Sequence, residues 1–265
     1  MCVCLYRNII MRSIVHINTE GLKIMMDKID IHSHIIYGVD DGSKDIEESI
    51  AMLKMLVNQG FSAVVATPHY SRRYRNDEPK KLIDKAYALQ QAVREEIGPD
   101  FQIYLGQEIF YSDDVVDLLD EGKLLTYVGG NHLLIEFHPS TPYSTITNAV
   151  KRLFMKGYRP VIAHIERYEA LRTDGRVEDL IEMGALTQMN YGEVGAHWYN
   201  QDTRWCRRIL KEQKVNFLAT DMHNIGDRKP DTQAAIHWME KSLDNNYIEA
   251  ICSGNAKKLL NHQKI

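Results

Sequence analysis

The feature that most constrains the fold is an alternation of short apolar segments with longer amphipathic segments, which begins at residue 27. Seven apolar or β-branched runs have the length of buried strands, at residues 28–31, 63–66, 102–105, 132–136, 160–163, 185–189 and 215–218. Six segments between them have helical periodicity, at residues 46–59, 79–97, 145–156, 177–183, 198–212 and 230–243. This alternation predicts an α/β fold with a parallel sheet covered by helices on both faces.

The placement of polar residues favours a closed barrel over an open, doubly wound sheet. Histidines and carboxylates end or follow six of the seven runs: His32, His34, Asp41, His69, Glu108, Glu136, His164, Asp221 and His223. An open sheet concentrates its site at one switch point, whereas a barrel gathers residues from many strand ends at one mouth. We therefore expect these side chains to converge at the carboxyl end of a barrel.

The residue types in this set indicate a metal centre. His32 and His34 are one residue apart, so both imidazoles face the same side of an extended chain. Imidazole and carboxylate ligands without thiolates suit divalent Mn, Fe or Zn, and this set is large enough for about two or three ions. Glu108 is placed to bridge two of them. Clustered metals clamp the oxygens of an in-line displacement, which predicts phosphoester hydrolysis.

The remaining candidates have simpler structural interpretations. Six histidines fit hydrogen-bonded or solvated structural positions: His16, His132, His138, His197, His237 and His262. Asp45 and Asp113 lie at expected helix starts and are interpreted as caps or solvated charges. Asp40 and Asp41, taken alone, would fit a turn before Gly42 equally well.

Two arginines follow ligand-type histidines and are candidates for binding phosphate. Arg167 lies three residues after His164, and Arg228 lies five residues after His223. A guanidinium group binds phosphate through two parallel hydrogen bonds. A third basic segment, residues 72–75, fits a substrate-facing rim or a plain solvated loop equally well.

Bulk properties exclude several function classes. The formal net charge of -4 argues against binding of nucleic acid through a broad basic surface. The longest apolar runs are far shorter than the roughly 20 residues of a membrane-spanning helix, so we expect no membrane insertion. The segment 1–26 lacks a signal-peptide pattern and is interpreted as an N-terminal extension, either upstream of the native start or a loosely ordered arm, before one domain at 27–265.

The four cysteines, Cys2, Cys4, Cys206 and Cys252, form no CxxC pair, and we expect a reducing, cytoplasmic setting. A cysteine-based phosphatase needs an arginine six residues after its nucleophile. Those positions after Cys206 and Cys252 hold Glu212 and Lys258, so this chemistry is not indicated.

The motifs together resemble one known superfamily over about residues 27–260. They are Asp-Ile-His-Ser-His from Asp30, Val-Asp-Asp-Gly-Ser-Lys from Val39, Ala-Thr-Pro-His from Ala66, Gly-Gln-Glu from Gly106, Leu-Ile-Glu-Phe from Leu134, Ala-His-Ile-Glu-Arg-Tyr from Ala163 and Thr-Asp-Met-His from Thr220. This set resembles the polymerase-and-histidinol-phosphatase (PHP) superfamily. Within it, the Asp-Asp-Gly and Glu-Arg elements favour the CpsB/YwqE-type bacterial protein-tyrosine phosphatases.

The resemblance implies a distorted seven-stranded (β/α)7 barrel with a trinuclear, typically manganese-dependent site. By position, it implies a first metal held by His32, His34, Glu108 and Asp221, a second by Glu108, Glu136 and His164, and a third by Asp41, His69 and His223. Arg167 and Arg228 would contact phosphate, and Asp221 or a metal-bound water would be the candidate proton donor.

The implied reaction is hydrolysis of phosphotyrosine by in-line attack of a metal-bound hydroxide. The implied substrate is a tyrosine-phosphorylated bacterial tyrosine autokinase that controls capsule or exopolysaccharide synthesis. Three other interpretations keep the same residues: a small-molecule phosphatase of the histidinol-phosphatase kind, an exonuclease, and a non-catalytic metal-binding docking module. The net charge disfavours the exonuclease, and the complete ligand set disfavours the docking module. The oligomeric state stays open.

Overall fold

Parallel strands alternating with helices make up the described part of the chain. The computed structural model describes residues 27–265, so the expected extension at residues 1–26, with His16, Cys2 and Cys4, lies outside the described residues. Seven strands correspond to the seven apolar runs: β1 (Lys28–Asp30), β2 (Phe61–Ala66), β4 (Gln102–Leu105), β6 (His132–Glu136), β7 (Arg159–Ile162), β8 (Leu186–Asn190) and β9 (Phe217–Ala219). Every strand pairing is parallel, as the alternation predicts.

Two short strands were not predicted, and they divide the sheet. β3 (His69–Tyr70) continues the path of β2, and β5 (Glu108–Phe110) continues that of β4. The break after β2 contains Pro68, which has no backbone N–H to donate to a ladder. The described strands therefore form a three-stranded sheet, β1-β2-β4, and a six-stranded sheet, β3-β5-β6-β7-β8-β9, in place of one sheet of seven strands.

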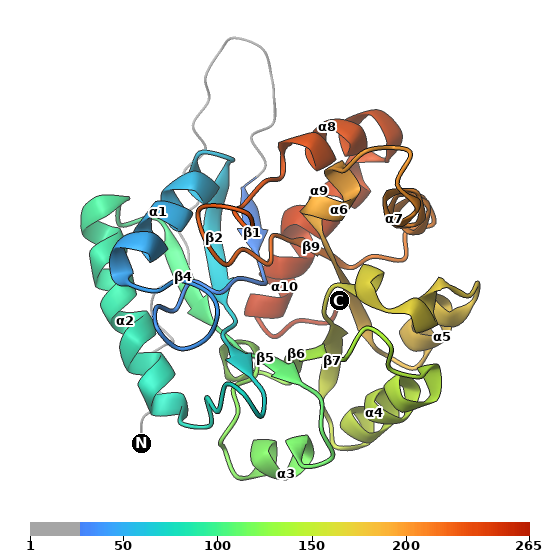
Figure 1. Ribbon diagram of the computed structural model, residues 1–265, viewed down its shortest axis with the longest axis horizontal. Helices are drawn as coiled ribbons and strands as arrows, with labels where there is room; N and C mark the ends of the chain where they lie inside the picture. The colour runs from blue at the N-terminus through green and yellow to red at the C-terminus, as the bar shows by residue number, and fades with distance from the viewer. Residues whose placement is uncertain (1–26) are drawn as a thin grey trace.

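Hydrogen bonds beyond the strand ends join the two sheets at their carboxyl side. Ser33 and Met222 form an isolated parallel bridge between the segments that follow β1 and β9. The backbone N–H of Asp221 donates to the carbonyl of His32 (2.9 Å), and the N–H of His34 donates to the carbonyl of Met222 (2.9 Å). Figure 1 shows the strands around the centre of the molecule with most helices outside them. The result is a barrel-like α/β fold with one ring of strand ends.

The six predicted helices are present with small shifts at their ends. They are α1 (Ile46–Val57), α2 (Pro79–Glu96), α4 (Tyr143–Met155), α5 (Arg176–Glu182), α7 (Gln201–Lys211) and α8 (Gln233–Ser242). Asp45 caps α1 by accepting a hydrogen bond from the N–H of Glu48, as expected. Pro79 begins α2, because its missing N–H costs nothing in the first turn.

Four shorter helices were not predicted: α3 (Val115–Asp120), α6 (Tyr191–Gly195), α9 (Asn245–Glu249) and α10 (Asn255–Leu260). The last two flank a π-helical turn, Ala250–Gly254. Each has six residues or fewer, which is too short for a hydrophobic period to be recognised in the sequence.

The core has two parts because alternate strand residues face opposite sides of the barrel wall. Ile29, Val65, Val161 and Phe217 belong to an interior cluster, which α10 completes with Ala256 and Leu259. Neighbouring strand residues such as Val64, Ile135, Ile162 and Leu218 belong to a larger cluster between the strands and the outer helices. The interior of the barrel is thus filled with apolar side chains. Polar residues gather at the carboxyl end of the strands.

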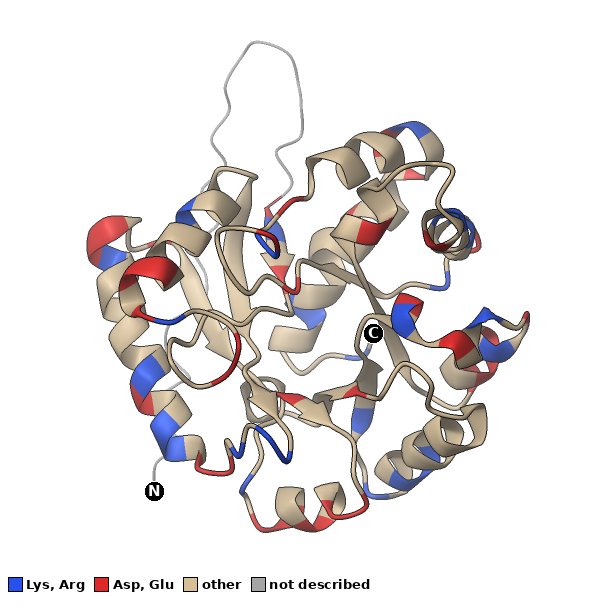
Figure 2. Cartoon of the chain, viewed as in Figure 1, with Lys and Arg blue, Asp and Glu red and all other residues tan. Residues whose placement is uncertain are grey.

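Charged residues lie mostly on the outer helices and loops, with the two signs interspersed (Figure 2). Among the described residues, no helix combines the length and apolar character needed to cross a bilayer.

Candidate metal centre

The first group of ligand-type side chains lies where β1, β5 and the segment after β9 meet. His32 and His34 point to the same side, with their Nε2 atoms 3.3 Å apart. Both Nε2 atoms lie 3.2 Å from Glu108 Oε2 and 3.4 Å from Asp221 Oδ1. These four residues are buried and their ligand atoms are close enough to share one metal ion.

A second group surrounds the other side of Glu108. His69 Nδ1 lies 2.9 Å from Glu108 Oε2 and 3.8 Å from Glu136 Oε2, and these three residues could hold an ion. His164 Nε2 lies 3.0 Å from Glu108 Oε1 and 3.5 Å from Glu136 Oε1. Glu108 is therefore shared between the two groups through its two oxygens, as a bridging ligand would be.

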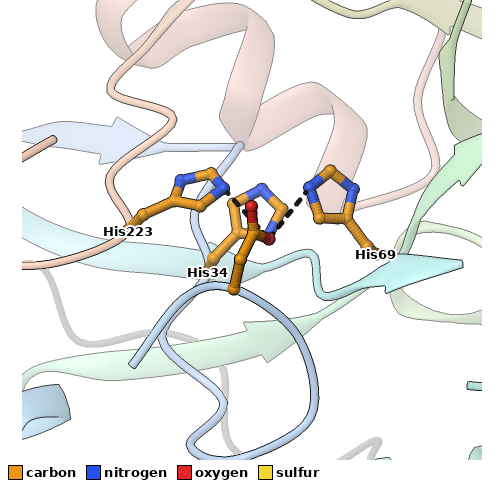
Figure 3. A group of neighbouring side chains, drawn as sticks. His34, His69 and His223 are labelled. Carbon is orange, nitrogen blue, oxygen red and sulfur yellow. Dashed lines mark ion pairs between the residues drawn. The ribbon is translucent and has the colours of Figure 1, made fainter. Parts of the chain in front are cut away.

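A third group forms around Asp41, in the loop before α1. Its Oδ1 lies 3.5 Å from His69 Nε2 and 3.7 Å from His223 Nε2, and His34 belongs to the same group. Figure 3 shows the imidazoles of His34, His69 and His223 turned toward a common centre, with the two ion pairs dashed. The structure thus brings all nine predicted ligands together. It places His34 in two groups and His69 beside Glu108, contacts that the implied assignment did not contain.

The chemistry of this donor set fits divalent cations. His223 Nε2 is buried and has no hydrogen-bond partner among the described residues, and the buried Glu108 Oε2 faces three imidazole nitrogens at 2.9–3.2 Å without a geometrically satisfactory hydrogen bond to any described residue. A buried polar atom without a partner costs free energy, so atoms of this kind need a ligand. Burial, together with the neighbouring His34, lowers the pKa of His223 to about 2, so its imidazole is neutral. A neutral imidazole has the lone pair that a metal requires.

Three imidazoles are held by a contact of Nδ1, which leaves Nε2 facing the other ligand-type side chains. His34 Nδ1 lies 2.9 Å from Asp40 Oδ2, and His32 Nδ1 lies 3.1 Å from Gln188 Oε1. His223 Nδ1 donates to the carbonyl of Asp221 (2.9 Å). This arrangement, in which Nδ1 is bonded and Nε2 is presented, is the usual one for metal-binding histidines.

Opposite charges offset the cost of burying the carboxylates. Burial alone would raise the pKa of Glu108, but the imidazoles of His32 and His69 outweigh it and hold that pKa well below its usual range. Burial also acts against Asp221, and His32, His34 and Arg167 together hold its pKa well below its usual range. Both groups are therefore carboxylates in this structure.

Two supporting residues were missed or undervalued by the sequence interpretation. The Asp40 side chain is buried and accepts hydrogen bonds from the backbone N–H groups of Gly42 (3.0 Å) and His69 (2.9 Å), besides contacting His34. Gln188, inside β8, contacts His32 and accepts from the N–H of His164 (2.7 Å). The signal for Gln188 was present, because a polar residue in a buried strand run needs partners.

Close packing requires glycine at position 42. A Cβ atom on Gly42 would lie 2.2 Å from the carbonyl oxygen of His34 and 2.5 Å from its Cβ. The loop that carries Asp40 and Asp41 therefore lies directly against the histidine pair, which only glycine permits here.

Two candidate ligands have left-handed backbone conformations. His164 has φ of 30° and Asp221 has φ of 52°. Non-glycine residues in this region carry strain, and such residues cluster at functional sites where the surrounding contacts hold them. In both cases the left-handed residue lies two residues after the last residue of a strand, β7 or β9, and its side chain contacts the other candidate ligands.

The two predicted phosphate-binding arginines meet at one carboxylate. Arg167 and Arg228 each donate through Nη2 to Asp221 Oδ2, at 2.7 and 2.9 Å. Asn190 donates to the same oxygen at 3.1 Å. The two guanidinium groups therefore lie side by side at the edge of the ligand groups.

The basic loop after β3 also reaches the site. Tyr74 stacks on His69, with ring centroids 5.7 Å apart and planes 10° apart, and the guanidinium of Arg73 lies 5.1 Å from the centroid of the Tyr74 ring. This geometry favours the interpretation of residues 72–75 as a rim of the site.

The five described histidines that were set aside in the sequence, His132, His138, His197, His237 and His262, belong to none of the ligand groups. His138, the one nearest to a candidate ligand in sequence, bonds to Ser140 Oγ (2.8 Å). Cys206 and Cys252 are free and buried, and burial raises the pKa of the Cys252 thiol to about 11. A buried, protonated thiol is not a nucleophile, which agrees with the exclusion of cysteine-based chemistry.

Comparison with known proteins gives consistent results. Residues 28–261 match the family described as "Capsular polysaccharide synthesis, CpsB/CapC". A relative, the tyrosine-protein phosphatase CpsB of Streptococcus pneumoniae, is 34% identical over 243 residues, which cover 89% of this chain and 100% of the relative.

Solved structures extend the comparison to the fold. A chain from crystal structures of YwqE of Bacillus subtilis and CpsB of Streptococcus pneumoniae, described as metal-dependent tyrosine phosphatases, aligns with a TM-score of 0.82 and 32% identity. That alignment covers 89% of this chain and 96% of the other. An amidohydrolase from Mycoplasma synoviae aligns with a TM-score of 0.58 at 12% identity, over 89% and 88% of the two chains, which shows a shared fold alone.

Proposed function

The chain belongs to the CpsB/CapC family of capsular polysaccharide synthesis proteins, and from this premise we propose that it is a metal-dependent protein-tyrosine phosphatase. One observation carries the proposal. Three ligand groups share Glu108, His34 and His69 among them, and two arginines lie beside them at Asp221. A cluster of cation sites next to paired guanidinium groups suits a phosphate monoester.

The proposed ligand assignment follows the three groups. One ion would be held by His32, His34, Glu108 and Asp221, one by Glu108, Glu136 and His164 beside His69, and one by Asp41, His69 and His223 with His34. We propose manganese as the metal, since mixed imidazole and carboxylate sites suit Mn, with Fe or Zn as alternatives. When bound, such ions neutralise phosphate charge and make a nucleophile available at neutral pH.

The protein's own side chains position the substrate. A phosphotyrosine carries close to two negative charges at neutral pH, and Arg167 and Arg228 would each donate to its oxygens. Asp221 holds both guanidinium groups before the substrate arrives. Because it accepts hydrogen bonds from two arginines and from Asn190, it is stabilised as a carboxylate, which supports an orienting role over proton donation.

The proposed substrate is a phosphotyrosine protein, and specifically a tyrosine-phosphorylated bacterial tyrosine autokinase of the capsule or exopolysaccharide system. The family's association with capsular polysaccharide synthesis supports this choice. We further propose that the two sheets act as one distorted seven-stranded barrel, in which β3 and β5 extend β2 and β4. The bridge between Ser33 and Met222 supports this description, since it links the first and last strands.

A direct comparison of substrates tests the function. The manganese-loaded protein should hydrolyse a phosphotyrosine peptide with higher kcat/KM than histidinol phosphate, and chelation should abolish both activities. A preference for histidinol phosphate would replace the proposal with a small-molecule phosphatase. Absence of hydrolysis of any aryl phosphate by the metal-loaded protein would leave a non-catalytic metal-binding module.

Arg167→Ala separates substrate binding from metal binding. The variant should have a raised KM for the phosphopeptide and an unchanged metal content, because Arg167 contacts Asp221 from outside the ligand groups. Loss of bound metal would show that Arg167 supports the ligands instead.

A further inference from the structure

A separate pocket opens directly beside the arginine pair. It has a volume of about 620 Å³, within the usual range for ligand pockets, and Arg167 forms part of its wall. The other walls come from the segment after β7, from α6 and from α7. None of the roles assigned above to the metal ligands uses this pocket. Because Arg167 lines the pocket and also contacts Asp221, the pocket adjoins the place proposed for the phosphate.

Two buried polar atoms of pocket-lining residues have no partner. Glu166 is only 3% exposed, its Oε1 accepts from the N–H of Asn190 (3.1 Å), and its Oε2 is buried without a hydrogen-bond partner among the described residues. Trp205 also lines the pocket, and its indole Nε1 is buried without a partner. Each of these two atoms therefore has an unused capacity for a hydrogen bond.

The charges around the pocket leave an excess of carboxylates. Arg172 is fully engaged, because it stacks on Trp205 (4.4 Å), pairs with Asp202 (2.9 Å) and donates to the carbonyl of Glu166. Arg167 is paired with Asp221. Glu169 and Glu193 also line the pocket, and neither makes an ion pair within the described part of the chain. The pocket is therefore electronegative even though it contains two arginines.

We infer that this pocket is a specificity subsite that receives a lysine or arginine side chain of the phosphopeptide, close in sequence to the phosphotyrosine held at the metal centre. The cationic head would face Glu169 and Glu193 on the pocket wall and would approach the unpartnered Oε2 of Glu166. A backbone carbonyl of the same peptide supplies an acceptor for Trp205. The inference rests on the proposed function, because it names the sequence context of the substrate.

A positional peptide scan tests the subsite. Synthetic alanine-based peptides with one phosphotyrosine carry a single lysine at each of the three positions on either side, and an all-alanine peptide is the reference. With the manganese-loaded protein, lysine at one or two positions should raise kcat/KM about two- to fivefold through a lower KM, the scale of a partly exposed ion pair. Glutamate at the same positions should lower it.

Charge reversal identifies the residues responsible. Glu193 lies on the pocket wall and is only partly exposed, so Glu193→Lys places a positive charge inside the pocket. This variant should lose the preference for lysine peptides and favour the glutamate peptides. Glu240→Lys, on the exposed surface of α8 and away from the pocket lining, should keep the preference of the unchanged protein. The ratio of lysine to alanine peptide within each variant is the readout, so a general loss of activity does not affect it.

Equal kcat/KM values for all peptides of the scan would overturn the subsite while the phosphatase proposal stands. A lysine preference that Glu193→Lys leaves unchanged would do the same. If no phosphotyrosine peptide is hydrolysed, the proposed function fails first. Fluorescence anisotropy of labelled lysine and alanine phosphopeptides would still measure binding to the pocket in that case, and equal affinities would overturn the subsite.

Discussion

At the scale of single residues, Asp40 and Asp41 show how neighbours in sequence diverge in space. Asp40 is buried against His34 and the backbone of His69, and its pKa falls to about 2 because these contacts outweigh the effect of burial. Asp41 is about half exposed and faces His69 and His223 from the open side. From the sequence alone, both aspartates were compatible with a simple turn before Gly42. Their separate roles follow from Gly42, which lets the loop lie against His34.

Replacing Asp41 tests whether it contributes to a metal group of its own. Asp41→Asn removes the carboxylate shared by His69 and His223, so bound metal should fall by about one ion per chain and turnover should fall by about 100-fold or more. Metal content is measured by plasma mass spectrometry alongside aryl phosphate hydrolysis. Asp113→Asn, which changes a fully exposed carboxylate, is the matched control. An unchanged metal count in Asp41→Asn would contradict the third group.

At the scale of elements, the predicted strands and helices are those with a clear hydrophobic period, and the missed ones are short. α10 is the clearest example, since it has six residues yet contributes Ala256 and Leu259 to the interior cluster. Its sequence, Asn-Ala-Lys-Lys-Leu-Leu, does not indicate whether it packs outside or inside the barrel. The tertiary position of α10 alone decides that Ala256 and Leu259 fill the interior.

The packing of α10 predicts a loss of stability without a direct effect on the site. Leu259→Ala leaves a cavity among buried interior residues and should lower the free energy of unfolding by about 2–5 kcal/mol. Urea denaturation measures the change, and kcat of the folded fraction should stay close to its original value. Lys258→Ala, on the exposed side of the same helix, should change stability by less than about 0.5 kcal/mol. Equal effects of the two substitutions would show that α10 does not fill the interior.

At the scale of the whole molecule, the ligand groups tie together segments that are far apart in the chain. Residues after β1, β2, β4, β6, β7 and β9 contribute to one site, and the sheets meet there through the bridge of Ser33 and Met222. Carboxylates and imidazoles of this ring lie within 3.2 Å of one another across these segments. A bound cation would cross-link the same segments.

Metal binding should therefore raise thermal stability. Saturation at about 100 times Kd contributes about 2.7 kcal/mol, which corresponds to a rise in Tm of about 5–10 °C for a domain of this size. Differential scanning calorimetry of chelated protein with and without added manganese measures the rise. His138→Ala, which changes a histidine outside the ligand groups, should show the same rise. A Tm independent of manganese would contradict a site formed across the strands.

The sequence by itself determined the order of strands and helices, the parallel pairing, and the set of ligand-type residues, because hydrophobic periodicity and strand-end positions are local properties. Tertiary structure alone decided which residues share a group, since this depends on distances between segments that are far apart in the chain, such as those of His32 and Asp221, 189 residues apart. It also decided the roles of Asp40 and Gln188, the division of the sheet by β3 and β5, and the pocket beside Arg167. These features arise from close packing and hydrogen bonding across the barrel, for which no single segment of the sequence carries a signal.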